Sequence, residues 1–132
     1  MKAGDKFVLK RIVGGNDTAE VLGSGGLPVY ATPSMICHME LSAYSLAMEH
    51  GHATVGTKVN ISHLRACKPG TEVIVTAELL EVDGRRLEFS VKAEDEKVFS
   101  AKVPTSVISS ILKDSWQNLD NEKNQETGKQ TD

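Results

Sequence analysis

The stretch TPSMICHMELSAYSLAMEH at residues 32–50 predicts one long helix. Thr32 is a favoured type of residue for a helix N-cap, and Pro33 suits the first helical position. No further proline or glycine interrupts the sequence until Gly51, so we place the helix at Pro33 to His50. Its apolar residues, which spread over more than half of the circumference, are Ile36, Met39, Ala43, Tyr44, Leu46, Ala47 and Met48. This helix is therefore expected at the centre of the fold, enclosed on several sides.

The segment before this helix predicts a β-hairpin followed by a loop. KFVLKRIV at Lys6 to Val13 and TAEVL at Thr18 to Leu22 are rich in β-branched and apolar residues, and Gly14 to Asp17 would form the turn between them. GSGGLP at Gly23 to Pro28 is unusually rich in glycine, which favours a mobile connection. We interpret this loop as a segment that could act as a lid.

After the helix, apolar residues alternate as they do in strands. In Thr54 to Leu64, one face would carry Val55, Thr57, Val59, Ile61 and His63. A turn at Lys68 to Gly70 leads to a strand at Thr71 to Val82, and Asp83-Gly84 is a strong hairpin signal into a strand at Arg86 to Glu94. These elements predict an α+β fold with an antiparallel sheet.

A last strand is predicted from Lys97 to Ile108, although Pro104 cannot donate to a sheet ladder and so indicates an edge, a bulge or an early end. From Lys113 onward the sequence is polar and offers little to pack against a core. We therefore predict one domain at residues 1–112 and a flexible tail at residues 113–132.

Length and charge narrow the classes of function. A chain of 132 residues suits one core, and its net charge of -3 has no basic stripe, so neither a nucleic-acid nor a membrane partner is expected. No apolar stretch is long enough to span a membrane, and the beginning does not resemble a secretion signal, which predicts a cytoplasmic protein. Cys37 and Cys67 are too few for a disulfide framework and are expected as buried thiols.

Glu40 is the most informative polar residue of the predicted helix. Its helical neighbours three, four and seven positions away are apolar or weakly polar: Ile36, Cys37, Ala43, Tyr44 and Ala47. A carboxylate buried there must be hydrogen-bonded, paired or shifted to a pKa that suits proton transfer. A position at the helix margin, with the carboxylate in solvent, is equally compatible with the pattern.

His63 and Thr32 are the other candidates for chemistry. Strand alternation places His63 on the face that should cover the helix, which would bring its imidazole toward Glu40. A hydrogen-bonded core histidine is the more common case. Thr32 is most simply a helix cap, and its alternative role is to bind or attack a carbonyl at the positive end of the helix dipole.

Four segments together resemble the fluoroacetyl-CoA thioesterase-like branch of the hotdog-fold thioesterases. They are ATPSM at residues 31–35, ME at 39–40, TVGTKVNISHLRA at 54–66 and EVDGRRLEFSVKAEDE at 81–96. The resemblance covers most of residues 5–100 in the same order, so the combination is far more specific than any one motif. It implies a long central helix wrapped by a five- to six-stranded antiparallel sheet, and a homodimer with active sites at the subunit interface.

The resemblance also implies an activity and a set of site residues. The catalytic Thr, Glu and His of the family fall on Thr32, Glu40 and His63, and the resemblance places Gly56 beside the acyl group. The implied reaction is hydrolysis of an acyl-CoA or related thioester to free acid and thiol. It requires no metal or organic cofactor, because thiolate is a good leaving group.

The sequence departs from the fluoroacetate-specific members in two places. Their lid carries aromatic residues, whereas GSGGLPVY at residues 23–30 has only Tyr30, and FSAKVPTSVI at residues 99–108 lacks the GxGxHER-like segment of relatives. The acyl group is therefore left open. Two alternatives are a non-catalytic acyl-CoA binding or sensing module and a hotdog hydratase or dehydratase. The retained Thr32, Glu40 and His63 favour hydrolysis.

Overall fold

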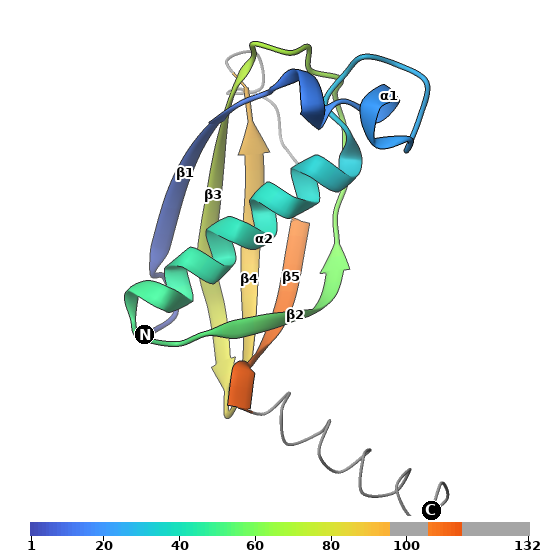
Figure 1. Ribbon diagram of the computed structural model, residues 1–132. Coiled ribbons are helices and arrows are strands. Elements are labelled where there is room, and N and C mark those ends of the chain that lie inside the picture. The colour runs from blue at the N-terminus through green and yellow to red at the C-terminus, as the bar shows by residue number, and fades with distance from the viewer. Residues whose placement is uncertain (96–105, 115–132) are drawn as a thin grey trace, which may run out of the picture.

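The computed structural model describes residues 1–95 and 106–114 and shows one long helix lying diagonally across a sheet (Figure 1). The elements in chain order are β1 (Lys6–Ile12), η1 (Gly15–Asp17), α1 (Ala19–Leu22), α2 (Thr32–Glu49), β2 (Thr54–Asn60), β3 (Glu72–Asp83), β4 (Arg86–Glu94) and β5 (Ser106–Leu112). The predicted α+β architecture with one long central helix is confirmed. The helix begins one residue earlier and ends one residue earlier than predicted.

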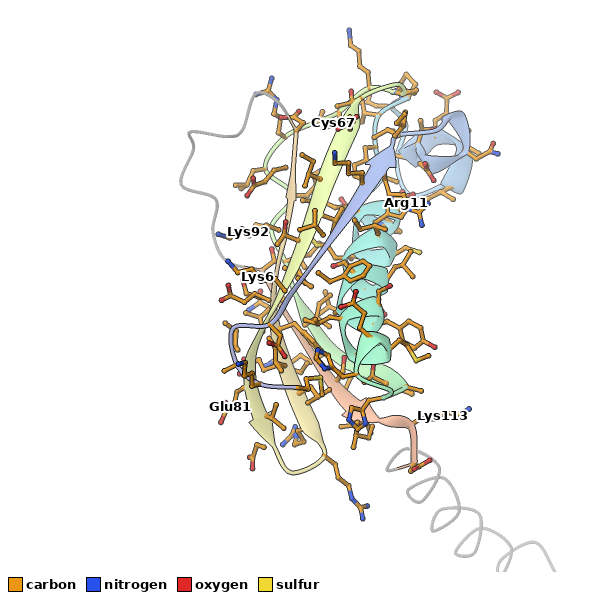
Figure 2. All side chains as sticks on the ribbon, turned by 90° about the vertical axis from the view of Figure 1, so that its left-hand side faces the viewer. Lys6, Arg11, Cys67, Glu81, Lys92 and Lys113 are labelled. Carbon is orange, nitrogen blue, oxygen red and sulfur yellow. The ribbon has the colours of Figure 1, made fainter. Side chains whose placement is uncertain are left out.

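The sheet has five antiparallel strands in the order β1-β3-β4-β5-β2. Figure 2 shows the sheet from the side, with α2 packed on one face and the side chains of Lys6 and Lys92 on the other. The hairpin between β3 and β4 turns through Gly84, whose φ of +58° favours glycine. This strand order leaves β1 and β2 at the two edges.

The core lies between α2 and the sheet. Alternate residues of β3 and β4 are buried, as a strand with one covered face requires, and the same face of β5 contributes Ile108. The buried strand residues of this layer are Val73, Val75, Ala77, Leu79, Leu87, Phe89, Val91 and Ile108, and the helix adds Met35, Met39, Ala43, Leu46 and Ala47. Burial of each large side chain contributes roughly 1.5–3 kcal/mol to folding.

The predicted strand at Thr18 to Leu22 is wrong, because this segment forms the short helix α1. The Thr18 hydroxyl accepts a hydrogen bond from the backbone N–H of Val21 at 3.4 Å, and Gly23 ends the helix in a left-handed conformation with φ of +76°. A capping threonine and a terminal glycine thus outweigh the strand preference of Val21. The glycine-rich segment that follows is an exposed loop, and its role as a lid stays a prediction.

Among the strands after the helix, β3 and β4 agree closely with the prediction, whereas β2 and β5 agree less well. The bounds of β4 are those predicted, and β3 is displaced by one residue. Strand β2 ends at Asn60, four residues earlier than expected. Strand β5 runs on to Leu112, beyond the predicted end at Ile108, whereas residues 97–105 and Pro104 lie outside the described residues, as does the tail from residue 115.

Two further observations concern the predictions about membrane-spanning segments and about the two cysteines. Within residues 1–95 and 106–114, no helix is long and apolar enough to cross a membrane. Both cysteines are free, but Cys37 is exposed and Cys67 is only half-buried, so the expectation of two buried thiols is wrong. Cys37 is exposed because its position on α2 faces away from the sheet layer that covers Met35 and Met39.

Candidate active site

The structure brings Thr32 and His63 together although 31 positions separate them in the chain. The Oγ1 atom of Thr32 lies 2.7 Å from Nδ1 of His63, a hydrogen-bonding distance. Thr32 is exposed at the start of α2, and His63 is half-buried in the irregular segment between β2 and β3. Together with the loop before α2, they line one open pocket that contains Ala19, Ser24, Val29, Tyr30, Ala31, Thr32, Pro33, His63, Leu64, Arg65 and Ala66.

The interpretation of Thr32 as a helix cap is wrong. The N-cap residue of α2 is Ala31, no side chain caps the helix, and Thr32 is already the first helical residue. Its hydroxyl is therefore free of the capping role and points to the imidazole of His63. The backbone N–H groups of the first turn remain at the positive end of the helix dipole, next to this pair.

His63 is carried by a different kind of element from the one predicted. The alternation from Val55 to His63 breaks at a register shift between Gly56 and Lys58. Val59, on this edge strand, is 37% exposed. Beyond Asn60, the chain leaves the sheet, so His63 is held by a loop and not by strand pairing. The predicted face of β2 therefore does not carry the imidazole toward Glu40.

A polar cluster anchors the loop that carries His63. The Cys67 thiol donates a hydrogen bond to Oδ2 of Asp95 at 3.4 Å, and Nε of Arg65 lies 3.8 Å from the same oxygen. Burial and the bond to Asp95 raise the pKa of Cys67, which keeps the thiol protonated as a donor. Sequence reasoning missed Asp95, although the alternation of inward residues along the strand at Arg86 to Glu94 continues to it.

Tyr30 packs behind the Thr32 and His63 pair. Its ring is buried, stacks on His38 with centroids 5.7 Å apart, and presents its edge to His63 at 6.3 Å. Burial, assisted by Asp17, raises the pKa of the Tyr30 hydroxyl, which stays protonated and is hydrogen-bonded to Nδ1 of His38. Sequence reasoning noted Tyr30 only as the aromatic residue of the loop and did not select His38, because no local pattern links them.

Glu40 lies in a second pocket, between α2 and β2. Its side chain is exposed, so the margin position is the one observed, and a Cβ atom placed on Gly56 would lie 3.2 Å from Glu40 Oε2. Gly56 thus permits the close approach of the carboxylate to the strand. The residues that line this cavity of about 240 Å³ are Cys37, Glu40, Leu41, Tyr44, Thr54, Gly56, Ile108 and Ser110.

Within one chain, the two pockets are separate. Glu40 follows Thr32 by eight helical residues, which is roughly 12 Å along the axis of a helix. His63 and Thr32 line the first pocket, and Glu40 and Gly56 line the second. The structure therefore assembles the predicted site residues as two pairs, one at the start of α2 and one at its middle, and does not place all of them in one pocket.

Comparison with known proteins gives the family. The sequence pattern of the family described as fluoroacetyl-CoA-specific thioesterase (FlK) matches residues 13–109. The chain belongs to this family. A curated fluoroacetyl-CoA thioesterase from Streptantibioticus cattleyicolor is 41% identical over 70 residues, which are 51% of this chain and 50% of that enzyme. The chain therefore spans about half the length of the curated family member that it matches.

Solved structures share the fold over nearly the whole chain. A point mutant of FlK superposes with a TM-score of 0.78 and 25% identity, covering 93% of this chain and 97% of that chain. The same mutant in complex with fluoroacetate and CoA gives a TM-score of 0.73 and 28% identity, covering 85% and 94%. A hot-dog-like protein from Thermanaerovibrio acidaminovorans gives a TM-score of 0.76 at 21% identity, covering 93% of each chain. The hotdog fold predicted from the sequence is confirmed.

Acidification is expected to destabilise the protein through His38. Burial lowers the pKa of His38 below its usual value of 6.5; Asp17 opposes this shift, and Arg11 adds to it. The unfolded chain then binds a proton at higher pH than the folded protein does, so the free energy of unfolding falls as the pH drops below about 6.5. In urea unfolding at about pH 7.5 and 5.5, His38→Gln should lose less stability than the wild type between the two conditions. His52→Gln is the exposed control. If His38→Gln lost as much stability between the two pH values as His52→Gln and the wild type do, this assignment would be contradicted.

Proposed function

We propose that this protein hydrolyses acyl-CoA thioesters to free acid and CoA. The observation that carries the proposal is the 2.7 Å contact between Thr32 Oγ1 and His63 Nδ1 at the start of α2, in a chain of the fluoroacetyl-CoA-specific thioesterase family. The Thr32 hydroxyl does not cap the helix and instead contacts the imidazole of His63. The hydroxyl can supply a hydrogen bond to the substrate, and the imidazole can carry a proton, next to the backbone N–H groups at the start of the helix. A purely structural threonine would be bonded to the helix instead.

In the proposed mechanism, Glu40 activates a water molecule for attack on the thioester carbonyl, and His63 protonates the leaving thiolate. Glu40 takes a proton from a water molecule while the water oxygen bonds to the carbonyl carbon. The cavity of about 240 Å³ beside Glu40 has room for a short acyl group and a water molecule. The Thr32 hydroxyl and the N–H groups of the first turn of α2 bind the developing oxyanion. The carbon–sulfur bond then breaks, and His63 passes the proton that Glu40 took from water to the departing CoA thiolate.

The proposal includes a homodimer that joins the two pairs of residues. Strand β2 is an edge strand and pairs only with β5 within the sheet that the structure describes. Beside it, Tyr44 and Met48 of α2 are 41% and 45% exposed. An exposed strand edge flanked by apolar side chains favours pairing with another chain. We place the β2 strand of a second copy against this edge, which forms one continuous sheet across both subunits.

Antiparallel pairing of the two β2 strands also explains the separation of the pockets. In such pairing, the start of one strand lies opposite the end of its partner. Gly56, with Glu40 against it, lies near the start of β2, and His63 follows the end of the strand. We therefore propose composite sites, in which Thr32 and His63 of one subunit face Glu40 and Gly56 of the other. The two-fold axis produces two such sites in each dimer.

The proposed substrate is a CoA thioester, as the FlK mutant bound to fluoroacetate and CoA illustrates for a protein of the same fold. The proposed location is the cytoplasm, because both cysteines are free thiols, which persist in reducing compartments. The acyl group is expected to be short, since the pocket at Glu40 is closed on its inner side by the buried Ile108.

Thiol release tests this proposal directly. Acetyl-CoA, fluoroacetyl-CoA, butyryl-CoA and phenylacetyl-CoA are each incubated with the protein, and free CoA is followed with a thiol-reactive dye. The proposal predicts release from at least one member of this panel, at a rate that rises linearly with enzyme concentration. Binding of CoA by calorimetry without release from any member contradicts hydrolysis and indicates an acyl-CoA sensing module instead.

Gly56→Ala is expected to lower turnover without unfolding the protein. The added methyl group would lie 3.2 Å from Glu40 Oε2, so the carboxylate has to shift by a few tenths of an ångström. A catalytic base displaced by this amount should lose about tenfold in kcat. Gly15→Ala is the control, because a Cβ atom at Gly15 has no neighbour within 4 Å. Equal kcat in the two variants would count against a role for the close approach of Glu40 to Gly56.

A further inference from the structure

Ser110 is a buried hydroxyl at the inner wall of the pocket that contains Glu40. It is only 4% exposed and lies on the face of β5 that also buries Ser106 and Ile108. In the sheet, Ser110 lies directly opposite Gly56 of β2. Glu40, Gly56 and Ser110 therefore meet at one place, where a helix and two neighbouring strands line the same cavity.

The hydroxyl of Ser110 has no hydrogen-bond partner within the part of the chain that the structure describes. Other buried serines show what is usual: Ser42 donates to the carbonyl of Met39 at 3.1 Å, and Ser106 accepts from the N–H of Ser62 at 3.4 Å. Among the described residues, Ser34 is also buried without a side-chain bond, but it does not line this cavity. A buried hydroxyl without a partner costs free energy, so one that borders a cavity indicates a ligand that supplies the partner.

We propose that Ser110 recognises a hydroxyl group on the acyl chain, and that the preferred substrates are short, neutral hydroxyacyl-CoA thioesters. This inference rests on the proposed thioesterase function. Opposite residues of an antiparallel pair have Cα atoms roughly 5 Å apart, so a carbonyl placed at Glu40 beside Gly56 brings the next one or two acyl carbons to Ser110. The substituent recognised is therefore on carbon 2 or carbon 3 of the acyl group.

The other residues of the pocket support the same class of acyl group. Thr54 and Tyr44 add two more hydroxyl groups to its wall, whereas Leu41 and Ile108 supply the apolar part. Glu40 is the carboxylate of this wall and would repel an acyl group that ends in a second carboxylate. A serine hydroxyl both donates and accepts, which matches the hydrogen-bonding capacity of an alcohol. The chemistry of the wall thus favours hydroxyacyl over simple alkyl and over dicarboxylic acyl groups.

The test compares substrates of equal chain length. We expect kcat/KM for 2-hydroxybutyryl-CoA or 3-hydroxybutyryl-CoA, assayed as separate enantiomers, to exceed that for butyryl-CoA by about tenfold in the wild type. In Ser110→Ala, this ratio should fall to about one, since the recognising hydroxyl is gone. Ser110→Cys provides a second variant of similar size and weaker hydrogen bonding, for which a reduced ratio is expected.

Ser109→Ala is the matched control, because it makes the same change one residue away on the opposite face of β5. It should keep the wild-type ratio. A wild type without preference for any hydroxyacyl substrate, or a ratio that survives in both Ser110 variants, overturns the inference while thiol release from butyryl-CoA still supports the thioesterase. Absence of thiol release from every substrate overturns the proposed function and this inference with it.

Discussion

Glu40→Gln should lower kcat for thiol release by about 10³-fold, because the amide cannot take a proton from the attacking water. The substitution keeps the shape of the side chain and removes only the charge. Glu40 is exposed and has no ion pair within the described residues, so the variant should fold with nearly unchanged stability. Steady-state thiol release with the best acyl-CoA of the panel measures the effect, and urea unfolding checks the fold.

Glu49→Gln is the control for this variant, since Glu49 is an exposed carboxylate near the other end of the same helix. It should retain wild-type turnover. If Glu40→Gln turned over substrate as fast as Glu49→Gln, the assignment of Glu40 as the base would be wrong. The site would then have to be sought at the Thr32 and His63 pair alone.

His63→Ala should lower kcat by roughly 10² to 10⁴-fold, since the proton carrier for the leaving thiolate is lost and Thr32 loses its partner at 2.7 Å. The measurement is kcat and KM for the same acyl-CoA across a pH series. Because the imidazole carries a proton and does not hold the acyl group, we expect KM to change much less than kcat.

His52→Ala controls for the loss of an imidazole, because His52 is exposed just after the long helix and lies in neither pocket. A His63→Ala variant whose kcat matched that of His52→Ala would exclude His63 from the reaction. A variant with unchanged kcat and a strongly raised KM would instead assign His63 to substrate binding.

The sequence predicted the long helix and β4 correctly, because interactions between residues near each other in the chain determine these elements. The long helix follows from an uninterrupted apolar pattern before Gly51, and β4 follows from the hairpin signal at Asp83-Gly84 and strict alternation. The strand predicted at Thr18 to Leu22 failed because a side-chain cap and a left-handed glycine decided the local structure there. The predicted end of β2 failed because pairing with β5 stops at Asn60, opposite Val107, and the alternation of side chains within one segment does not show where a partner strand stops.

The candidate site was predicted as a set of residues but not as an arrangement. Thr32 and His63 meet as the functional interpretation requires, through a loop that sequence alternation could not describe. The approach of Glu40 to His63 is not seen within one chain, since the two residues line different pockets. A second subunit is outside what the pattern of a single chain can specify, and the partners Tyr30, His38 and Asp95 depend on long-range packing.

Mixed dimers test the composite site most directly. Glu40→Gln and His63→Ala chains, each with a different affinity tag, are expressed together, and dimers that contain one chain of each kind are purified through both tags. In a composite site, one of the two sites pairs the intact His63 of the first chain with the intact Glu40 of the second. We predict that these mixed dimers recover about half of the wild-type kcat per dimer, although each parent variant has lost at least about 100-fold in kcat. Mixed dimers as inactive as their parents would contradict the account, because every site would then draw Glu40 and His63 from the same chain.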